Sequence, residues 1–232
     1  MKKVLITGAT SGIGYSTLEL LAHEYEILFT YHSNTDFAKE IEKKFNSKGY
    51  YLDLGDPKSI EALAQKIECL DVLINNAGIA IDNDFNLKTL DEFTKVVNTN
   101  LGGTYYLTKL LVDKMNKGGC VLFVSSTNGI DTEYLESIDY DVSKAGIISL
   151  MHNFTKLLSP NVRTVTIAPG WVETPMNKEL SEDFKKQEEK KIYLNRFAAP
   201  KEIAQVIKFM ISEDANYINN TVIRVDGGVK ND

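Results

Sequence analysis

Residues 7–14 read TGATSGIG and follow directly on the apolar run Val4, Leu5 and Ile6. A glycine-rich turn between a strand and a helix is typical of a dinucleotide-phosphate cradle. One glycine permits the tight turn, another lets the backbone approach a pyrophosphate, and a third lets the following helix pack closely. We therefore expect a helix over residues 12–23 whose free N–H groups face a phosphate. Taken alone, the motif is equally compatible with a glycine-rich turn that binds nothing.

Beyond this stretch, short apolar runs alternate with segments of helical spacing. The runs cover residues 4–6, 26–31, 49–54, 71–78, 120–126, 162–170 and 221–228. Continuous apolar runs are typical of strands buried on both faces of a parallel sheet. The pattern predicts an α/β fold, a doubly wound parallel sheet of about seven strands with about six helices on both faces. Ligands of such sheets bind beyond the carboxyl ends of the strands.

Length and composition predict one ordinary globular domain. The chain has 232 residues, is 43% hydrophobic and 25% charged, and has no linker-like or repeated segment, so we expect a single domain over residues 1–232. The net charge of −6 argues against nucleic acid or an anionic membrane surface as the main partner. No run has the character of a signal peptide or a transmembrane span, so the cytoplasm is the expected location.

Other charged and sulfur-containing residues have ordinary interpretations. The run KKQEEKK at 185–191 mixes both signs, which predicts a solvated helix face. Cys69 and Cys120 each precede an apolar run, where an inert buried thiol is the usual state and a disulfide is not expected. No metal site is predicted.

Polar turns follow several of the predicted strands. Asn75 to Gly78 read NNAG after the fourth, Ser125 to Gly129 read SSTNG after the fifth, and Ala168 to Gly170 read APG at the end of the sixth. Each motif alone is an ordinary turn. Because the carboxyl ends of parallel strands meet at one edge, these turns are expected to share a site with the glycine-rich stretch.

Tyr140 and Lys144 are four residues apart in a predicted helix, so their side chains share one face. A neighbouring ammonium favours the phenolate, which would lower the pKa of the tyrosine from its reference of about 10 toward the range useful for proton transfer. A solvated helical pair is the alternative for these two residues taken alone.

Together, TGxxxGxG, NNAG, SxxG, YxxxK and the PG turn, in this order, resemble the short-chain dehydrogenase/reductase family over the whole chain. The DGG stretch at 226–228 resembles the family's ending. The resemblance implies a Rossmann-type fold and hydride transfer by a nicotinamide cofactor. It implies that Tyr140 exchanges a proton with the substrate and that Ser126 polarises the carbonyl group, with Ser125 as the less favoured candidate. Lys144 would hold the nicotinamide ribose and lower the pKa of Tyr140.

The resemblance also assigns Asn100, in the stretch NTNLGG, to anchoring a water that links Lys144 to solvent. Asn98, two residues earlier, does not match the family's asparagine position. The alternative for Asn100 is an asparagine that hydrogen-bonds the backbone at a helix bulge. The step from Ser126 to Tyr140 is one residue longer than in the family members compared, and the acidic loop 131–139 is expected to absorb the extra residue.

NADP(H) is the favoured cofactor, because residues 30–34 (TYHSN) lack the acid that would bind an adenosine ribose 2′-hydroxyl, and Asp36 comes too late. His32 is the candidate partner of a 2′-phosphate, although a surface histidine is the alternative, and Ser11 stands where many NADP-preferring relatives carry a basic residue. NAD(H) therefore stays open. The expected cofactor contacts are Gly8, Thr10, Ser11, Gly12, Ile13, Gly14, His32, Asp53, Leu54, Asn76, Ala77, Gly78, Tyr140, Lys144, Pro169, Gly170, Val172 and Thr174.

For the substrate, the resemblance is nearest to the 3-oxoacyl-[acyl-carrier-protein] reductases, with residues 174–200 as a substrate lid. This predicts reduction of a ketone or 3-oxoacyl thioester. A sugar or polyol dehydrogenase is the alternative enzyme, and a nucleotide-binding regulator without turnover is the alternative of another class. The acidic chain offers only Lys114 and Lys117 as a basic docking site for an acidic carrier protein.

The resemblance further implies a homo-oligomer, a tetramer or a dimer. An apolar stripe fits such an interface or, alternatively, an intramolecular core. It comprises Tyr105, Leu107, Leu110, Leu111, Ile147, Leu150, Met151 and Phe154.

Overall fold

The computed structural model of the protein describes residues 1–178 and 180–229. Its described part holds one sheet of seven parallel strands in the order β3-β2-β1-β4-β5-β6-β7. The strands are β1 (Lys2–Ile6), β2 (Tyr25–Tyr31), β3 (Lys48–Tyr51), β4 (Leu70–Asn75), β5 (Met115–Val124), β6 (Val162–Pro169) and β7 (Thr221–Val225). The predicted doubly wound parallel sheet is confirmed, with the chain reversing direction across the sheet between β1 and β4.

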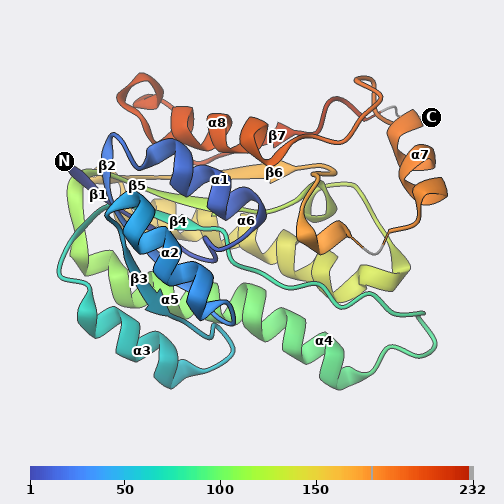
Figure 1. Cartoon of the computed structure of the whole chain (residues 1–232), viewed down its shortest axis with the longest axis horizontal. Helices are drawn as coiled ribbons and strands as arrows, with labels where there is room; N and C mark the ends of the chain where they lie inside the picture. Colours follow the sequence, from blue (N-terminus) through green and yellow to red (C-terminus); the bar gives the residue numbers. More distant parts are fainter. Residues whose placement is uncertain (179, 230–232) are drawn as a thin grey trace.

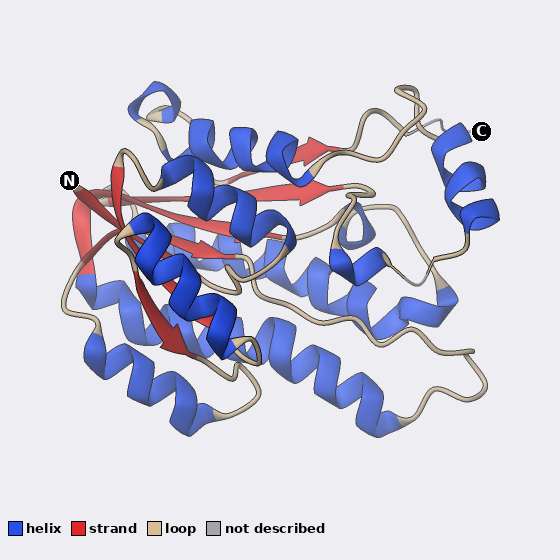
Figure 2. Ribbon diagram, in the orientation of Figure 1, coloured by secondary structure: helices blue, strands red, loops and turns tan. Residues whose placement is uncertain are grey.

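Helices cover both faces of this sheet (Figures 1 and 2). They are α1 (Gly12–Leu21), α2 (Thr35–Phe45), α3 (Pro57–Lys66), α4 (Leu90–Val97), α5 (Thr104–Leu111), α6 (Ile138–Leu158), α7 (Glu182–Lys190) and α8 (Pro200–Ile211). The described residues thus hold more helices than the six expected. One reason is that a π-helical turn, Asn98–Gly103, separates α4 from α5, and the other is that the predicted lid contains a helix of its own.

The strands are apolar at successive positions because each face of the sheet packs against its own helices. Val4 and Ile6 point into a cluster with residues of α1 and α8, whereas Leu5 points into a cluster with residues of α3, α5 and α6. Successive strand residues face opposite sides, so a strand covered on both sides must be apolar throughout. The polar turn Asn76 to Gly78, which the sequence pattern attached to a strand, lies just outside β4.

The apolar stripe considered for an oligomer interface is mainly intramolecular core. Leu107, Leu111, Ile147, Met151 and Phe154 are buried within the chain. Leu110 and Leu150 pack against the same core, and Tyr105 is the member that stays exposed. The intramolecular alternative therefore accounts for most of the stripe.

Both cysteines are free thiols. Cys120 is buried as predicted, and its burial raises the pKa of the thiol to about 11, which keeps it protonated and unreactive at neutral pH. Cys69 is only partly buried, contrary to expectation, because it precedes the first residue of β4 and lies outside the sheet. Within residues 1–178 and 180–229, no helix has the length and apolar character needed to cross a membrane.

Candidate active site

A cavity of about 1140 Å³ opens at the carboxyl ends of the strands, where the polar turns converge. The glycine-rich turn, the ends of β2 and β4, the turns after β5 and β6, and helix α6 all contribute to its wall. Most residues that the sequence assigned to cofactor or chemistry line it: Gly8, Thr10, Ser11, Gly12, Ile13, His32, Asp53, Leu54, Asn76, Ala77, Gly78, Ser126, Tyr140, Lys144, Pro169, Gly170, Val172 and Thr174. Gly14 and Asn100 are not among the lining residues, but Gly14 packs against Gly8 and Asn76, and Asn100 is hydrogen-bonded to Ile79, all of which line the cavity.

The glycine-rich turn has the geometry that its sequence predicts. Gly8 and Gly12 adopt φ angles of 66° and 51°, a region that residues with a Cβ atom rarely enter. A Cβ atom on Gly14 would lie only 2.3 Å from the carbonyl oxygen of Gly8. Two glycines therefore permit the turn and the third permits the close packing of α1, whose N-terminus points into the cavity and can hold a phosphate group.

Asn76 fixes the position of this turn. Its Nδ2 donates to the carbonyl oxygens of Thr7 (2.9 Å) and Gly8 (3.2 Å). In return, the hydroxyl oxygen of Thr7 accepts from the backbone N–H groups of Asn76 (2.9 Å) and Ala77 (3.0 Å). The NNAG turn thus buttresses the cradle, and Thr7, which was not among the predicted contacts, is half of that link.

Tyr140 and Lys144 lie on one face of α6, with the Lys144 Nζ 5.3 Å from the centre of the Tyr140 ring. Lys144 is buried, its Nζ donates to the carbonyl oxygen of Val124 (3.0 Å), and desolvation lowers its pKa to about 8. Burial of this lysine is unusual outside functional sites.

The pKa of Tyr140 differs from the expectation. Instead of being lowered by Lys144, it is raised to about 12, chiefly by desolvation. The carboxylates of Asp141 and Asp82 act in the same direction, whereas a hydrogen bond with Ser126 acts against it. Tyr140 is therefore a protonated phenol across the neutral range.

The two neighbouring serines have different partners. The Ser125 hydroxyl donates to the carbonyl oxygen of Lys144 (2.8 Å). This hydrogen bond holds α6 against the end of β5. The Ser126 hydroxyl contacts Tyr140 and lines the cavity. Both serines line the cavity, and the Ser126 hydroxyl is the one of the two that contacts Tyr140.

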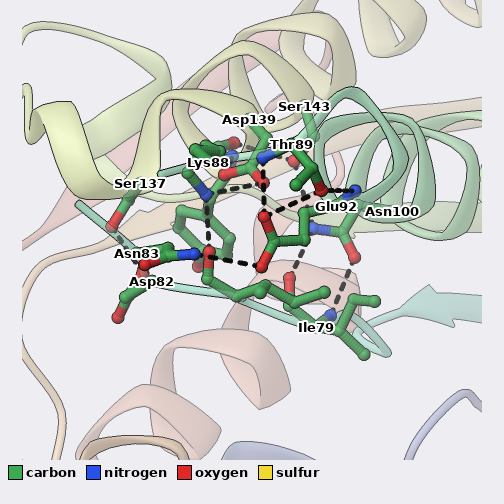
Figure 3. A network of polar contacts seen from close by, with 12 residues as sticks. Ile79, Asp82, Asn83, Lys88, Thr89, Glu92, Asn100, Ser137, Asp139 and Ser143 are labelled. Carbon is green, nitrogen blue, oxygen red and sulfur yellow. Dashed lines mark hydrogen bonds and ion pairs between the residues drawn. The ribbon is translucent and has the colours of Figure 1, made fainter. Parts of the chain in front are cut away.

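Asn100 lies within the π-helical turn and is buried. Its Oδ1 accepts from the backbone N–H of Ile79, and its Nδ2 donates to the carbonyl oxygen of the same residue, both at 2.8 Å (Figure 3). The Nδ2 also donates to the Ser143 hydroxyl (3.1 Å). This is the backbone-bonded arrangement that the sequence left as an alternative, and it links residue 79 in the cavity wall to α6.

A buried ion pair joins the segment after β4 to the start of α6 (Figure 3). Lys88 Nζ lies 2.9 Å from Asp139 Oδ2, with both side chains almost fully buried, and it also donates to the carbonyl oxygen of Ile81. Asp139 Oδ1 accepts from the backbone N–H of Tyr140 (2.9 Å). The pair thereby holds the backbone of Tyr140 next to the cavity wall.

Replacing Lys88 by methionine should lower the free energy of unfolding by about 3–5 kcal/mol, because Asp139 would be left as an unpaired buried carboxylate. Adding Asp139→Asn should restore most of this loss. Urea denaturation measures both variants, and Lys185→Met, which removes one partner of an exposed pair, is the matched control with only a slight effect. Equal effects of Lys88→Met and Lys185→Met would contradict this assignment.

The end of β2 places His32 at the rim of the cavity. Its ring stacks on Tyr51, with the centroids 5.8 Å apart, and its Nε2 lies 3.7 Å from Asp53 Oδ2. The histidine side chain stays 63% exposed, so its ring is accessible to a ligand in the cavity.

The predicted lid contains a buried carboxylate that the sequence did not reveal. Glu188 of α7 accepts from Tyr134 Oη (2.7 Å), Trp171 Nε1 (3.2 Å) and Lys191 Nζ (2.6 Å). Desolvation opposes its ionisation, but these hydrogen bonds hold the pKa of Glu188 below its ordinary value. The run 185–191 is therefore not solvated throughout. Glu188 points inward and fastens α7 to Tyr134 and Trp171 in the cavity wall.

The fold and this site define a nicotinamide-dependent oxidoreductase, and comparison with known proteins agrees. The chain matches the family model described as enoyl-(acyl carrier protein) reductase over residues 8–230. The protein belongs to the short-chain dehydrogenase/reductase family, oxidoreductases that act on carbonyl and alcohol groups with NAD or NADP.

Within the family, the chain is similar to 3-oxoacyl-thioester reductases. It is 34% identical over 241 residues to the 3-oxoacyl-[acyl-carrier-protein] reductase FabG of Aquifex aeolicus (strain VF5), with 98% of this chain and 97% of that protein covered. It is 32% identical over 249 residues to the acetoacetyl-CoA reductase of Acinetobacter sp. (strain RA3849), with the same coverage. A solved short chain dehydrogenase from Burkholderia cenocepacia J2315 in complex with NADP shares the fold at a TM-score of 0.91, with 21% identity and 98% and 97% of the two chains covered.

Proposed function

We propose that the protein is an NADPH-dependent reductase of a ketone or 3-oxoacyl thioester. The observation that carries the proposal is the placement of Ser126, Tyr140 and Lys144 together in the wall of one cavity, with a phosphate cradle in the same wall. The similar FabG and acetoacetyl-CoA reductase support the thioester part of the substrate class.

The cavity fits a dinucleotide. The strained backbone at Gly8 and Gly12 and the N-terminus of α1 form the cradle for the pyrophosphate, and Asp53 and Leu54 line the part of the wall proposed to hold the adenine. Pro169, Gly170, Val172 and Thr174 line the side proposed for the nicotinamide, where Lys144 would hold the ribose. NADPH, when bound, supplies the hydride that reaches the carbonyl carbon.

The remaining chemistry belongs to the side chains. The Ser126 hydroxyl and the Tyr140 phenol both donate to the carbonyl oxygen, where negative charge develops as the hydride arrives. Tyr140 then transfers its proton to this oxygen, so the carbonyl becomes an alcohol and the tyrosine a phenolate, which solvent reprotonates. With a pKa raised to about 12, the Tyr140 phenol holds this proton at neutral pH before the reaction.

His32 is proposed to contact the 2′-phosphate of NADPH. His32→Ala should raise the dissociation constant for NADPH by about tenfold or more, because a hydrogen bond to a charged group contributes about 1.5–3 kcal/mol. The dissociation constant for NADH should stay unchanged. Fluorescence titration measures both constants, with His23→Ala, at another exposed histidine, as the control. Equal weakening for NADPH and NADH would contradict the proposed contact.

The docking surface for an acyl carrier protein is weaker than the sequence suggested. Lys114 is not a free basic group, because its Nζ donates to the carbonyl oxygens of Ala64 and Ile67, both at 2.6 Å, at the end of α3. We therefore favour a small-molecule thioester or ketone over a carrier-bound substrate.

Absorbance of NADPH tests the proposed function. A panel of acetoacetyl thioesters, diketones and sugars is offered with NADPH, and NADH is assayed in parallel. We expect oxidation of NADPH with the acetoacetyl thioesters or diketones. Activity with sugars alone would instead support the sugar or polyol dehydrogenase, and no turnover with any of them would favour a nucleotide-binding regulator.

A further inference from the structure

The hydroxyl of Ser126 is held by the residue two positions further along the chain. Its Oγ donates to Asn128 Oδ1 (2.9 Å) and accepts from the backbone N–H of Asn128 (3.2 Å). Asn128 also lines the cavity. The same Oγ also makes a longer contact with the carbonyl oxygen of Pro169 (3.5 Å) and lies beside Tyr140. The two shorter hydrogen bonds both involve Asn128, which is therefore the main restraint on this hydroxyl.

The orientation of the Asn128 amide is itself fixed. Its Nδ2 donates to Asp141 Oδ1 at 2.7 Å. An ionised carboxylate only accepts hydrogen bonds, so the NH2 group must face Asp141 and the amide oxygen must face Ser126. The direction of the Ser126 hydroxyl thus depends on the charge of Asp141.

Asp141 also connects the acidic loop 131–139 to the helix that carries Tyr140. Its Oδ2 accepts from the backbone N–H of Tyr134 (3.1 Å), in the middle of the acidic stretch 131–139. Asp141 directly follows Tyr140 in α6. The same carboxylate thus orients Asn128 and fastens the acidic loop 131–139 beside Tyr140.

We propose that Asn128 and Asp141 are positioning residues that hold the Ser126 hydroxyl ready for the carbonyl oxygen of the substrate. The proposal rests on the proposed reductase function. Before substrate binds, the hydroxyl hydrogen points to Asn128 Oδ1. When a carbonyl oxygen arrives, the hydrogen turns to it, while the backbone N–H of Asn128 keeps the Ser126 oxygen in place. Neither residue needs to touch the substrate for this role.

The test is a double-mutant cycle on the full-length protein with NADPH and the best substrate found in the panel. Asn128→Ala should lower kcat by about tenfold to a hundredfold, since misplacing a positioned group by about 1 Å can cost about 100-fold. The dissociation constant for NADPH should not change. In a Ser126→Ala background, Asn128→Ala should have almost no further effect, because its role is exerted through Ser126.

Two variants at Asp141 keep the test independent of folding defects. Asp141→Asn retains an acceptor for the Tyr134 N–H and should lose less activity than Asp141→Ala. Hydrogen exchange of the Tyr134 amide should accelerate in Asp141→Ala, a result that requires no turnover. Glu40→Gln, which removes an exposed carboxylate of α2 that does not line the cavity, is the charge-matched control.

The outcomes separate this proposal from the proposed function. If the wild-type protein fails to oxidise NADPH with every carbonyl substrate of the panel, both proposals are overturned. An active wild type together with a wild-type kcat for Asn128→Ala would overturn the positioning role alone. So would a full additional loss in the Ser126→Ala background, which would show that Asn128 acts on the fold and not on the serine.

Discussion

Tyr140→Phe is expected to lower the rate of NADPH-dependent reduction by about 100- to 10,000-fold, the contribution of a positioned general acid. The ring would keep its place in the wall of the cavity and its contact with Lys144, whose Nζ lies 5.3 Å from the ring centre. The phenolic hydroxyl would be lost, and with it both the proton and the hydrogen bond with Ser126. The dissociation constant for NADPH should therefore stay near that of the wild type.

Stopped-flow absorbance and fluorescence titration measure the rate and the affinity of this variant separately. Tyr217→Phe is the matched control, since Tyr217 is fully exposed and should tolerate the same loss of a hydroxyl. Turnover by Tyr140→Phe at a rate comparable with the wild type would rule out Tyr140 as the proton donor.

Gly14→Ala should remove most of the affinity for NADPH, so that the dissociation constant rises by about tenfold or more. The added Cβ atom would lie 2.3 Å from the carbonyl oxygen of Gly8 and 2.6 Å from Nδ2 of Asn76, closer than nonbonded atoms approach. Either α1 or the cradle must move, which also costs about 1–3 kcal/mol of stability, as is usual for overpacking. Because the cradle is built from backbone groups, its movement removes the contacts proposed for the pyrophosphate.

Gly102→Ala is the control for the cradle variant. A Cβ atom there would meet only Asn98 Oδ1, at 4.0 Å, so this glycine has room for a methyl group. Thermal unfolding of both variants separates loss of the fold from loss of binding. A folded Gly14→Ala protein that binds NADPH as tightly as the wild type would contradict the assignment of the cradle.

The features that the sequence predicted are those that depend on local chain geometry. The glycine spacing at 8, 12 and 14 and the four-residue step from Tyr140 to Lys144 each follow from one turn or one helix, and the apolar runs follow from burial of strands on both faces. Motifs at the ends of parallel strands then converge because of the topology.

The features that the sequence missed depend on contacts between distant segments. The pKa of Tyr140 is raised and not lowered because burial, together with the carboxylates of Asp141 and Asp82, outweighs the hydrogen bond with Ser126. The burial of Tyr140 and its distance from Asp82 are determined only by the folded chain. The sequence pattern predicts a solvated position for Glu188, because its partners Trp171 and Tyr134 are distant in the chain and reach it only when α7 packs against them.

The central claim is that a hydride passes from the cofactor to a carbonyl carbon in this cavity, and isotope transfer tests it most directly. The wild-type protein is incubated with an acetoacetyl thioester and NADPH carrying deuterium at the transferable position of the nicotinamide, and the product is analysed by mass spectrometry. Deuterium on the dihydronicotinamide face that the protein uses should appear on the carbinol carbon of a 3-hydroxyacyl thioester. With both deuterated faces tested, the absence of the hydroxy product, or a product without deuterium from either, would contradict the account.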